Sequence, residues 1–216
     1  MRDTNNRTSD RYRIVQDTSE RSKLIVGLGN PGRKYEMTRH NVGWLVLDCL
    51  HDRWGWGKGR SAFDGLFVDG RLQSPDGQSI RTMLLKPLTF MNRSGQSVRQ
   101  ALDFYKLQPE DVLIVMDDMA LPIDRIRLRA GGSAGGHNGL DDVIRCLGTR
   151  DVPRLRVGIG ACPPGWDPKA YVLGRFSSDE KEEVGVSIQD AADAAEDWVF
   201  RGIQKAMEKY NRKPGS

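Results

Sequence analysis

The feature that most constrains the fold is an alternation of short apolar runs with segments of helical periodicity. The apolar runs at residues 23–28, 112–116 and 155–158 each end at or beside a glycine or an aspartate, as buried strands commonly do. Between them lie residues 41–54 and 92–105, in which apolar side chains recur at the spacing of one helix face. This alternation predicts an α/β fold, a single-domain, mostly parallel twisted sheet with helices on both faces.

Other segments extend this sheet. Residues 66–68 and 79–85 flank a polar Ser-Pro-Asp-Gly turn at 74–77, and we expect them to form a β-hairpin. A further strand is expected near 126–128 and a short helix from Leu140. The hairpin would widen the sheet.

The last helix is expected behind Ser177, whose spacing to Glu180 fits a capping box. One face of this helix would carry apolar side chains toward the core. These are Ile188, Ala195, Trp198, Ile203 and Tyr210.

The length of 216 residues suits one domain, and neither a second domain nor an internal repeat is visible. Residues 1–21 contain five arginines and four acidic residues but no apolar stretch. This composition argues against a secretory signal and disfavours a transit peptide, which avoids acidic residues. We expect a disordered polar extension at 1–21, the folded domain at 22–210 and a flexible tail at 211–216.

Composition excludes a membrane-spanning protein, because no run approaches ~18 apolar residues. The formal charge of +4 suits an anionic partner such as nucleic acid, although many proteins without such a partner are as basic. Cys49, Cys146 and Cys162 lie far apart, without the paired spacing of a metal knuckle or a redox pair. We therefore expect reduced cysteines, no bound metal and a cytoplasmic location.

Residues 27–32, Gly-Leu-Gly-Asn-Pro-Gly, formally match the dinucleotide-binding fingerprint. That motif requires a helix to begin at once, so that its N-terminal amides meet a pyrophosphate. Here Pro31 and further residues intervene before the next helix, and Asp48 falls inside a helical pattern instead of ending a second strand. We interpret the match as accidental and expect no nicotinamide or flavin cofactor.

A second glycine-rich stretch at 131–139 precedes the short helix and has amides that could hold a phosphate. It lacks the Lys-Ser/Thr ending of a nucleotide-triphosphate loop. Asn138 in this stretch and Asn92 before the earlier helix each have a plain structural interpretation as helix caps. The residues alone leave both interpretations open.

Several polar residues follow the ends of predicted strands. Asp117 ends a central strand at the carboxyl edge of the sheet, where open α/β sheets bind ligands. The Asn30 loop and the Asn138 loop would open at the same edge, and one cleft could unite them. His40, just before a helix, is one of only three histidines, although an exposed histidine there is commonly incidental.

Several short motifs occur along the chain in an order that resembles one known family. They are LIVGLGNPG (24–32), Tyr35, TRHN (38–41), KPLTFMN (86–92), Gly95, MDD (116–118), LP (121–122), GGHNGL (135–140) and RLRVGIG (154–160). Over roughly residues 23 to 210, the chain resembles the bacterial peptidyl-tRNA hydrolases.

The resemblance implies a role for each matching residue. The catalytic histidine and its aspartate partner fall on His40 and Asp117, and the amide of Asn30 or Asn92 would help to position the water or the ester carbonyl. Substrate-binding positions fall on Tyr35, Asn41, Met91, Asn92, His137 and Asn138, and positions that hold a tRNA phosphate on Arg129 and Arg156. The chain departs from the family pattern at Asp118, Ala120 and the loop 162–164, which puts loop details in doubt but not the chemistry.

The implied activity is hydrolysis of the ester that joins a peptide, or an N-blocked amino acid, to the 3′ end of tRNA. This reaction would recycle peptidyl-tRNA dropped from ribosomes, with water as nucleophile and neither metal nor cofactor. The family also suggests a monomer. The alternative is a non-catalytic RNA-binding relative of the same fold, similar to the related chloroplast splicing factors.

Overall fold

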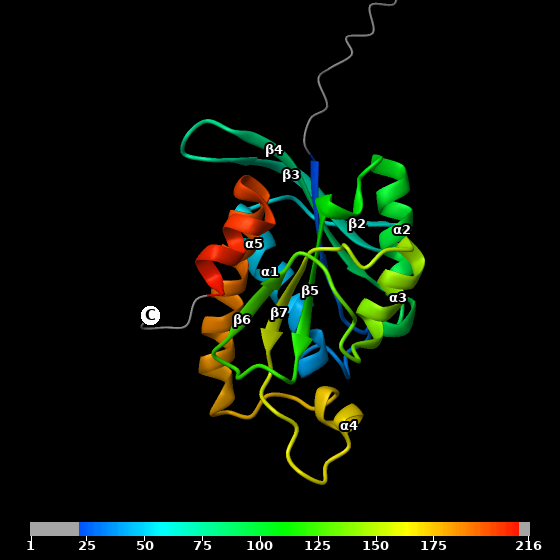
Figure 1. Cartoon of the computed structure of the whole chain (residues 1–216), viewed down its shortest axis with the longest axis vertical. Coiled ribbons are helices and arrows are strands. Elements are labelled where there is room, and N and C mark those ends of the chain that lie inside the picture. The colour runs from blue at the N-terminus through cyan, green and yellow to red at the C-terminus, as the bar shows by residue number, and fades with distance from the viewer. Residues whose placement is uncertain (1–21, 212–216) are drawn as a thin grey trace, which may run out of the picture.

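The computed structural model describes residues 22–211, which form one seven-stranded sheet with helices on both faces (Figure 1). The expected extension at 1–21 and residues 212–216 of the expected tail lie outside the described residues. The strand order is β2-β3-β4-β1-β5-β7-β6. The strands are β1 Ser22–Gly27, β2 Arg60–Ala62, β3 Gly65–Gln73, β4 Ser79–Pro87, β5 Val112–Asp118, β6 Ile126–Arg129 and β7 Arg154–Gly158.

The four central strands run parallel, with β1 between β4 and β5 and with β7 beside β5. The strands β3 and β6 run the other way, and β2 is antiparallel to β3. The mostly parallel α/β sheet predicted from sequence is therefore confirmed, and the expected hairpin is β3–β4. Because parallel strands end at the same edge, the loops after β1, β5 and β7 open together.

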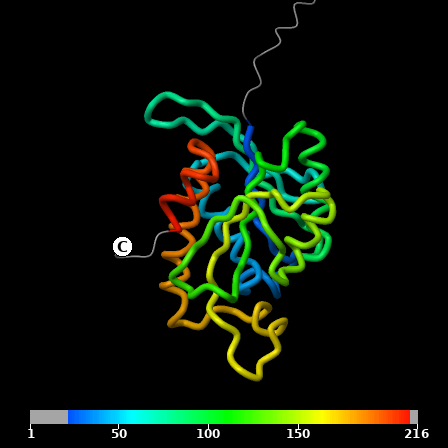
Figure 2. Tube along the Cα trace, viewed as in Figure 1, coloured from blue at the N-terminus to red at the C-terminus, as the bar shows by residue number. Residues whose placement is uncertain are grey.

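The helices pack on opposite faces of the sheet, with α1 and α5 on one face and α2 and α3 on the other (Figure 2). Reciprocal hydrogen bonds of a capping box join Ser177 and Glu180 before α5, as the sequence predicted. Gly202, with φ of 75°, kinks this helix. The helices are α1 Val42–Trp54, α2 Ser94–Tyr105, α3 Asn138–Leu147, α4 Pro168–Val172 and α5 Glu180–Tyr210, with 3-10 turns η1 Arg39–Asn41, η2 Met91–Arg93 and η3 Pro109–Asp111.

Two hydrophobic cores lie on the two faces of the sheet, and β1 contributes to both. Ile25 packs in the core beneath α1 and α5, whereas Leu24 and Val26 pack in the core beneath α2 and α3. All three side chains are fully buried, and each such burial contributes roughly 1.5–3 kcal/mol. Burial on both faces explains why the central strands have continuous apolar sequences instead of alternating ones.

Close packing of α1 on the sheet accounts for Gly27, the first glycine of the dinucleotide-like motif. A Cβ on Gly27 would lie 2.4 Å from the carbonyl oxygen of Gly43 in α1. A Cβ on Gly43 would lie 2.4 Å from the carbonyl oxygen of Val115 in β5. These glycines allow contact between helix and strand backbones, and α1 begins only at Val42, well beyond the glycine loop. Close packing therefore accounts for Gly27 in this motif.

We predict that Gly43→Ala lowers the free energy of unfolding by at least 1–3 kcal/mol, because the added methyl group overlaps rigid backbone. The matched control is Gly185→Ala on α5, where the position is exposed and a Cβ meets no atom within 4 Å. The control should gain up to about 1 kcal/mol from improved helix propensity. Urea unfolding measures both values, and equal stability of the two variants would contradict the packing argument.

Candidate active site

A cleft of about 810 Å³ opens at the carboxyl edge of the central strands. Its walls come from the loop after β1, the turns η1 and η2, the end of β5, the glycine-rich loop before α3, and α4. The lining residues are Asn30, Tyr35, His40, Phe90, Met91, Asn92, Met116, Asp117, Asp118, Met119, Ala120, Ala134, Gly135, Gly136, His137, Asn138, Arg156, Asp167, Pro168, Lys169, Val172 and Leu173.

Most residues that the sequence assigned to a site meet in this cleft. Two do not line it. Asn41 is fully buried behind the wall, and Arg129 is exposed on β6 outside the cleft. The lining residues among the expected ones are Asn30, Tyr35, His40, Met91, Asn92, Asp117, His137, Asn138 and Arg156.

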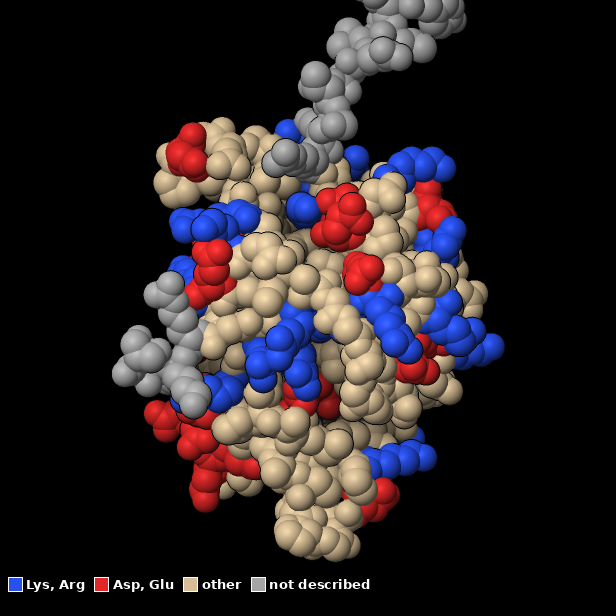
Figure 3. All heavy atoms as spheres, in the orientation of Figure 1, with Lys and Arg blue, Asp and Glu red and all other residues tan. Residues whose placement is uncertain are grey.

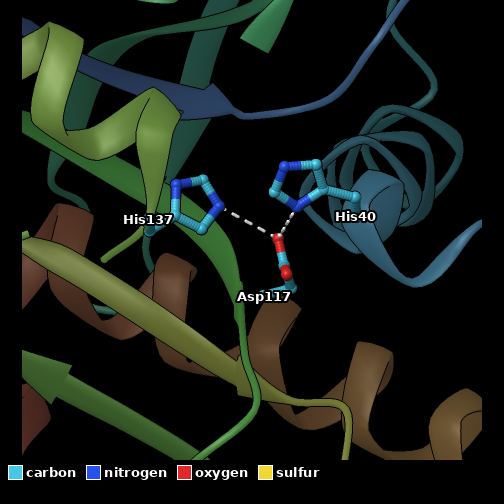
Figure 4. A group of neighbouring side chains, drawn as sticks. All are labelled: His40, Asp117 and His137. Atoms are coloured by element: carbon cyan, nitrogen blue, oxygen red, sulfur yellow. Dashed lines mark hydrogen bonds and ion pairs between the residues drawn. The ribbon is translucent and has the colours of Figure 1, made fainter. Parts of the chain in front are cut away.

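Two histidines converge on one carboxylate oxygen at the floor of the cleft (Figure 4). Asp117 Oδ1 lies 2.8 Å from His40 Nδ1 and 3.0 Å from His137 Nε2. An ionised carboxylate only accepts hydrogen bonds, so each of these ring nitrogens carries the donated proton. Neutral His40 therefore has its lone pair on Nε2, which has no partner among residues 22–211.

The tautomer of His137 is fixed by the hydrogen bond at its second ring nitrogen, Nδ1. The His137 Nδ1 atom accepts the backbone N–H of Leu140 at 3.2 Å, as the N-terminal cap of α3. Nε2 must then carry the proton that it donates to Asp117. The sequence suggested Asn138 as this cap, but Asn138 is the first residue of the helix and the preceding histidine takes the role.

Asp117 is almost fully buried, with 4% of its surface exposed. Burial by itself raises the pKa of this carboxyl group, but the electrostatic interaction with the His137 ring and the hydrogen bonds from His137 and His40 outweigh it. The pKa of Asp117 is therefore held well below its usual range. The group stays ionised wherever the protein would work, and it can stabilise a positive charge on His40.

Asn30 is held in place by the two neighbouring walls. Asn41 accepts its backbone N–H at 2.9 Å through Oδ1 and donates Nδ2 to its carbonyl oxygen at 3.0 Å. The backbone N–H of Met91 donates to Asn30 Oδ1 at 2.9 Å. Because Met91 supplies a donor, the orientation of the Asn30 amide is settled, and only its Nδ2 donor is left without a partner among the described residues.

Asn92 and Asn138 are exposed at the cleft, and neither side-chain amide makes a hydrogen bond with residues 22–211. Neither residue caps its helix. The N-terminal cap of α2 is Arg93, without a side-chain bond, and that of α3 is His137. The plain structural interpretation of both asparagines is therefore wrong, and both amides are available to a ligand.

The sequence analysis missed two parts of the wall, Phe90 and α4. Phe90 lies inside the KPLTFMN motif and is 57% exposed at the cleft. The helix α4 is a single turn, too short for periodicity to reveal. A local signal was present, because Asp167 accepts the N–H groups of Lys169 and Ala170 and is followed by Pro168, a residue favoured at the first helical position.

Basic side chains gather over β6 and β7, beside the cleft (Figure 3). Arg156 on β7 forms an ion pair with Asp118 and lies directly opposite Arg127 on β6. Arg127 and Arg129 are exposed and form no ion pair with other described residues. The sequence analysis missed Arg127 because only the pairing of β6 with β7 places it beside Arg156.

The charge of the Asp118 carboxylate is balanced by Arg156. The Asp118 side chain is 9% exposed, Oδ1 accepts the N–H of Ala120 at 2.9 Å, and Oδ2 lies in the ion pair with Nε of Arg156. The guanidinium is therefore the group that balances this buried charge. Removing Arg156 would leave an uncompensated carboxylate, which costs stability as well as a cation.

The atoms of His40, Asp117 and His137 that could bind a metal ion lie within 4.8 Å of one another. Two imidazoles and a carboxylate are common ligands of Zn²⁺. His40 Nδ1 and His137 Nε2 already donate hydrogen bonds to Asp117 Oδ1, however. A metal ion bound by these three atoms would replace the protons that the two bonds require, so binding of an ion there and the hydrogen-bonded arrangement exclude each other.

Comparisons with known proteins agree with this geometry. The family model described as peptidyl-tRNA hydrolase matches residues 24–216. A peptidyl-tRNA hydrolase of Rhodopirellula baltica is 46% identical over 194 residues, covering 90% of this chain and 100% of that one. Its counterpart from Bacillus thuringiensis subsp. konkukian is 46% identical over 189 residues, covering 88% and 99%.

Among solved structures, the crystal structure of peptidyl-tRNA hydrolase from Acinetobacter baumannii superposes with a TM-score of 0.78 at 36% sequence identity. The match covers 89% of this chain and 95% of that one. Sequence and fold therefore agree over nearly the whole length of the relatives. The chain belongs to the peptidyl-tRNA hydrolase family.

Proposed function

We propose that this protein hydrolyses the ester bond between a peptide, or an N-blocked amino acid, and the 3′ end of tRNA. The observation that carries the proposal is the His40–Asp117 pair, which leaves the basic Nε2 atom of His40 at the cleft without a partner among the described residues. An imidazole held in this tautomer is a general base for a water molecule. The names of the relatives supply the substrate class.

In this mechanism His40 Nε2 takes a proton from water as the water oxygen attacks the ester carbonyl. The imidazolium that forms is stabilised by Asp117, which remains ionised and accepts a hydrogen bond from Nδ1–H. When the tetrahedral intermediate collapses, the C–O bond to the ribose breaks. The proton from Nε2 then passes to the departing ribose oxygen, so that the free acid and the free tRNA leave.

Asn30 is placed to assist at the carbonyl. Its Oδ1 is occupied by Met91 N–H, so the amide can offer only its Nδ2 donor. A donor suits a carbonyl oxygen that becomes negative in the transition state, and such a contact gains strength as charge develops. The same donor could hold the attacking water by its oxygen. The rigid support from Asn41 keeps the amide in place during the reaction.

The remaining cleft residues would bind the two parts of the substrate. The unpartnered amides of Asn92 and Asn138 suit the peptide backbone, and Tyr35, Met91 and His137 would shape the space around it. The buried Asn41 would contribute through Asn30 and not by direct contact. The basic side chains of Arg156, at the cleft, and Arg129, outside it, would hold a tRNA phosphate.

The proposed reaction needs neither metal nor cofactor, because an ester is labile enough for water activated by a general base. We further propose a cytoplasmic monomer. Ribosomes would supply the substrate in the cytoplasm, and the resemblance to the family suggests the monomer. Among residues 22–211, none of the helices has both the length and the apolar composition needed to cross a bilayer.

The proposal predicts that the wild-type protein releases N-acetyl-amino acid from N-acetyl-aminoacyl-tRNA, at the same rate with and without excess EDTA. His40→Ala should turn over about 10²–10⁴-fold more slowly while binding tRNA nearly as well, because it lacks only the base. Asp117→Asn should also be slow, since an amide can hold the ring but cannot stabilise its charge. Release of labelled amino acid and a separate tRNA-binding titration measure the two properties.

Binding of the tRNA by wild type without any release would instead support the non-catalytic RNA-binding alternative. Full activity of His40→Ala would show that another group is the base. Loss of activity in EDTA, restored by Zn²⁺, would show that the His40–Asp117–His137 cluster holds a catalytic metal.

The free amide of Asn138 predicts a role in selectivity. Wild type should cleave blocked aminoacyl-tRNA much faster than unblocked aminoacyl-tRNA, because the Asn138 amide favours a substrate with a peptide-like linkage over a charged amine. Asn138→Ala should narrow the ratio of the two kcat/KM values by about tenfold, through loss of a hydrogen bond worth ~1 kcal/mol or more. An unchanged ratio would place the selectivity on another residue.

The basic side chains predict a salt-dependent effect on tRNA affinity. Arg129→Ala with Arg156→Ala should flatten the slope of log affinity against log salt by about one to two units, since each lost phosphate contact contributes roughly 0.7–0.9. Hydrolysis of a short fragment that carries only the terminal adenosine should hardly change.

The matched control for these arginines removes two cations from α5, Arg201→Ala with Lys205→Ala, both exposed. The control should leave the salt slope unchanged. Because Arg156 also balances Asp118, the free energy of unfolding must be measured for each variant, and Arg129→Ala alone serves as the variant without that complication. Equal losses on full-length tRNA and on the fragment would overturn the phosphate assignment.

A further inference from the structure

The turn that carries His40 consists of three residues whose side chains point in three directions. A 3-10 helix has three residues per turn, so neighbouring side chains in η1 diverge by about 120°. His40 faces the cleft, Asn41 binds the backbone of Asn30, and Arg39 points away from the cleft toward the start of α5. Fixing two of these side chains therefore fixes the direction of the third.

Arg39 is the most extensively bonded of the three. Its Nη2 donates to both carboxylate oxygens of Glu180, at 2.9 and 2.7 Å, and its Nη1 donates to the carbonyl oxygen of Arg175 at 2.6 Å. The guanidinium also lies over the rings of Tyr171 and Phe176, 4.5 and 5.2 Å from their centres. Only 9% of Arg39 is exposed, so these contacts are shielded from water.

The partners of Arg39 belong to the segment that forms one wall of the cleft. Tyr171 lies in α4, which lines the cleft through Pro168, Lys169 and Val172. The backbone N–H of Arg39 donates to the carbonyl oxygen of Gly174 at 2.9 Å, just after this helix. The wall and the turn that carries the histidine are thus joined through one buried guanidinium.

The carboxylate of Glu180 is also held by a hydrogen bond at the start of α5. Its Oε2 accepts the backbone N–H of Ser177 at 2.7 Å in the capping box of α5. Burial by itself raises the pKa of Glu180, but the hydrogen bond from Ser177 and the bonds and charge of Arg39 lower it overall. The carboxylate stays ionised, and it connects the helix that covers one face of the sheet to the cleft.

We propose that Arg39 is a positioning residue for the reaction: its bonds to Glu180 and to the carbonyl of Arg175 orient η1, so that His40 Nδ1 meets Asp117 and Nε2 meets the substrate. The same bonds hold the α4 wall of the cleft at a fixed place relative to the base. This inference rests on the proposed hydrolase function. It assigns a task in the reaction to a residue that touches neither substrate nor reacting atoms.

Lysine cannot replace arginine in this position. A single ammonium group cannot bond Glu180 and the Arg175 carbonyl in the same fixed, planar geometry, nor stack its flat face on Tyr171 and Phe176. Arg39→Lys keeps the positive charge, but it loses the bonds that hold the turn η1 in one orientation. A displacement of the base by about 1 Å can cost 10²-fold in rate, so turnover should respond more strongly than binding.

The chain offers a matched control in Arg53, which joins α1 to α5 away from the cleft. Its guanidinium donates to Asp193 at 2.6 Å, Glu196 at 2.8 Å and Gln189 at 2.9 Å. Arg53→Lys removes a comparable network between a helix and α5 without affecting η1. A purely structural role of Arg39 would make the two variants alike in turnover once both are folded.

The experiment compares Arg39→Lys, Arg53→Lys and wild type on N-acetyl-aminoacyl-tRNA, at a temperature where circular dichroism shows all three to be fully folded. We expect kcat of Arg39→Lys to fall about 10–100-fold with KM changed less than about threefold. We expect kcat of Arg53→Lys to stay within about twofold of wild type. An equal kcat for Arg39→Lys and Arg53→Lys would overturn the inference.

Glu180→Gln provides an independent variant, because it weakens the same junction and leaves Arg39 in the chain. Its kcat should fall in the same direction, and combining it with Arg39→Lys should add little, since both changes break one contact. Should Arg39→Lys not fold, an unchanged kcat in Glu180→Gln would refute the proposal. A wild-type protein without hydrolase activity would refute the proposed function itself, a result distinct from either.

Discussion

The site depends on one oxygen atom, Asp117 Oδ1, which accepts a hydrogen bond from each of two histidines. A carboxylate buried to this degree is costly unless donors replace the water it has lost, and His40 and His137 are those donors. The arrangement fixes both tautomers, since the carboxylate requires a proton on each facing nitrogen. It also leaves His40 Nε2 as the basic atom at the cleft.

Everything that brings these three side chains together is tertiary packing. Asp117 ends a central strand, His40 lies in a 3-10 turn before α1, and His137 caps α3. The contact of Gly27 and Gly43 lets α1 lie directly on the sheet, so that the preceding turn reaches the end of β5. Arg39 holds the same turn from the opposite side through α5.

The cleft has two chemically different regions. Near the histidines it offers amide donors and apolar side chains such as Phe90, which suit a peptide and its ester. Beyond Arg156 the surface becomes basic over β6 and β7, which suits the phosphates of a nucleic acid. The Asp118–Arg156 ion pair lies where the two regions meet. In this pair the guanidinium of Arg156 neutralises the Asp118 carboxylate, which is next to Asp117 in the chain.

The sequence by itself determined the fold class, because continuous apolar runs between amphipathic segments can be buried only in a central parallel sheet with helices on both faces. Ordered motifs also identified the residues of the cleft, His40, Asp117 and Asn30 among them. Only the tertiary structure decided that Asn41 supports Asn30 from a buried position, that His137 and not Asn138 caps α3, and that Arg127 lies beside Arg156. The physical reason is that periodicity and motif spacing report local geometry, whereas hydrogen-bond partners and strand register depend on which distant segments pack together.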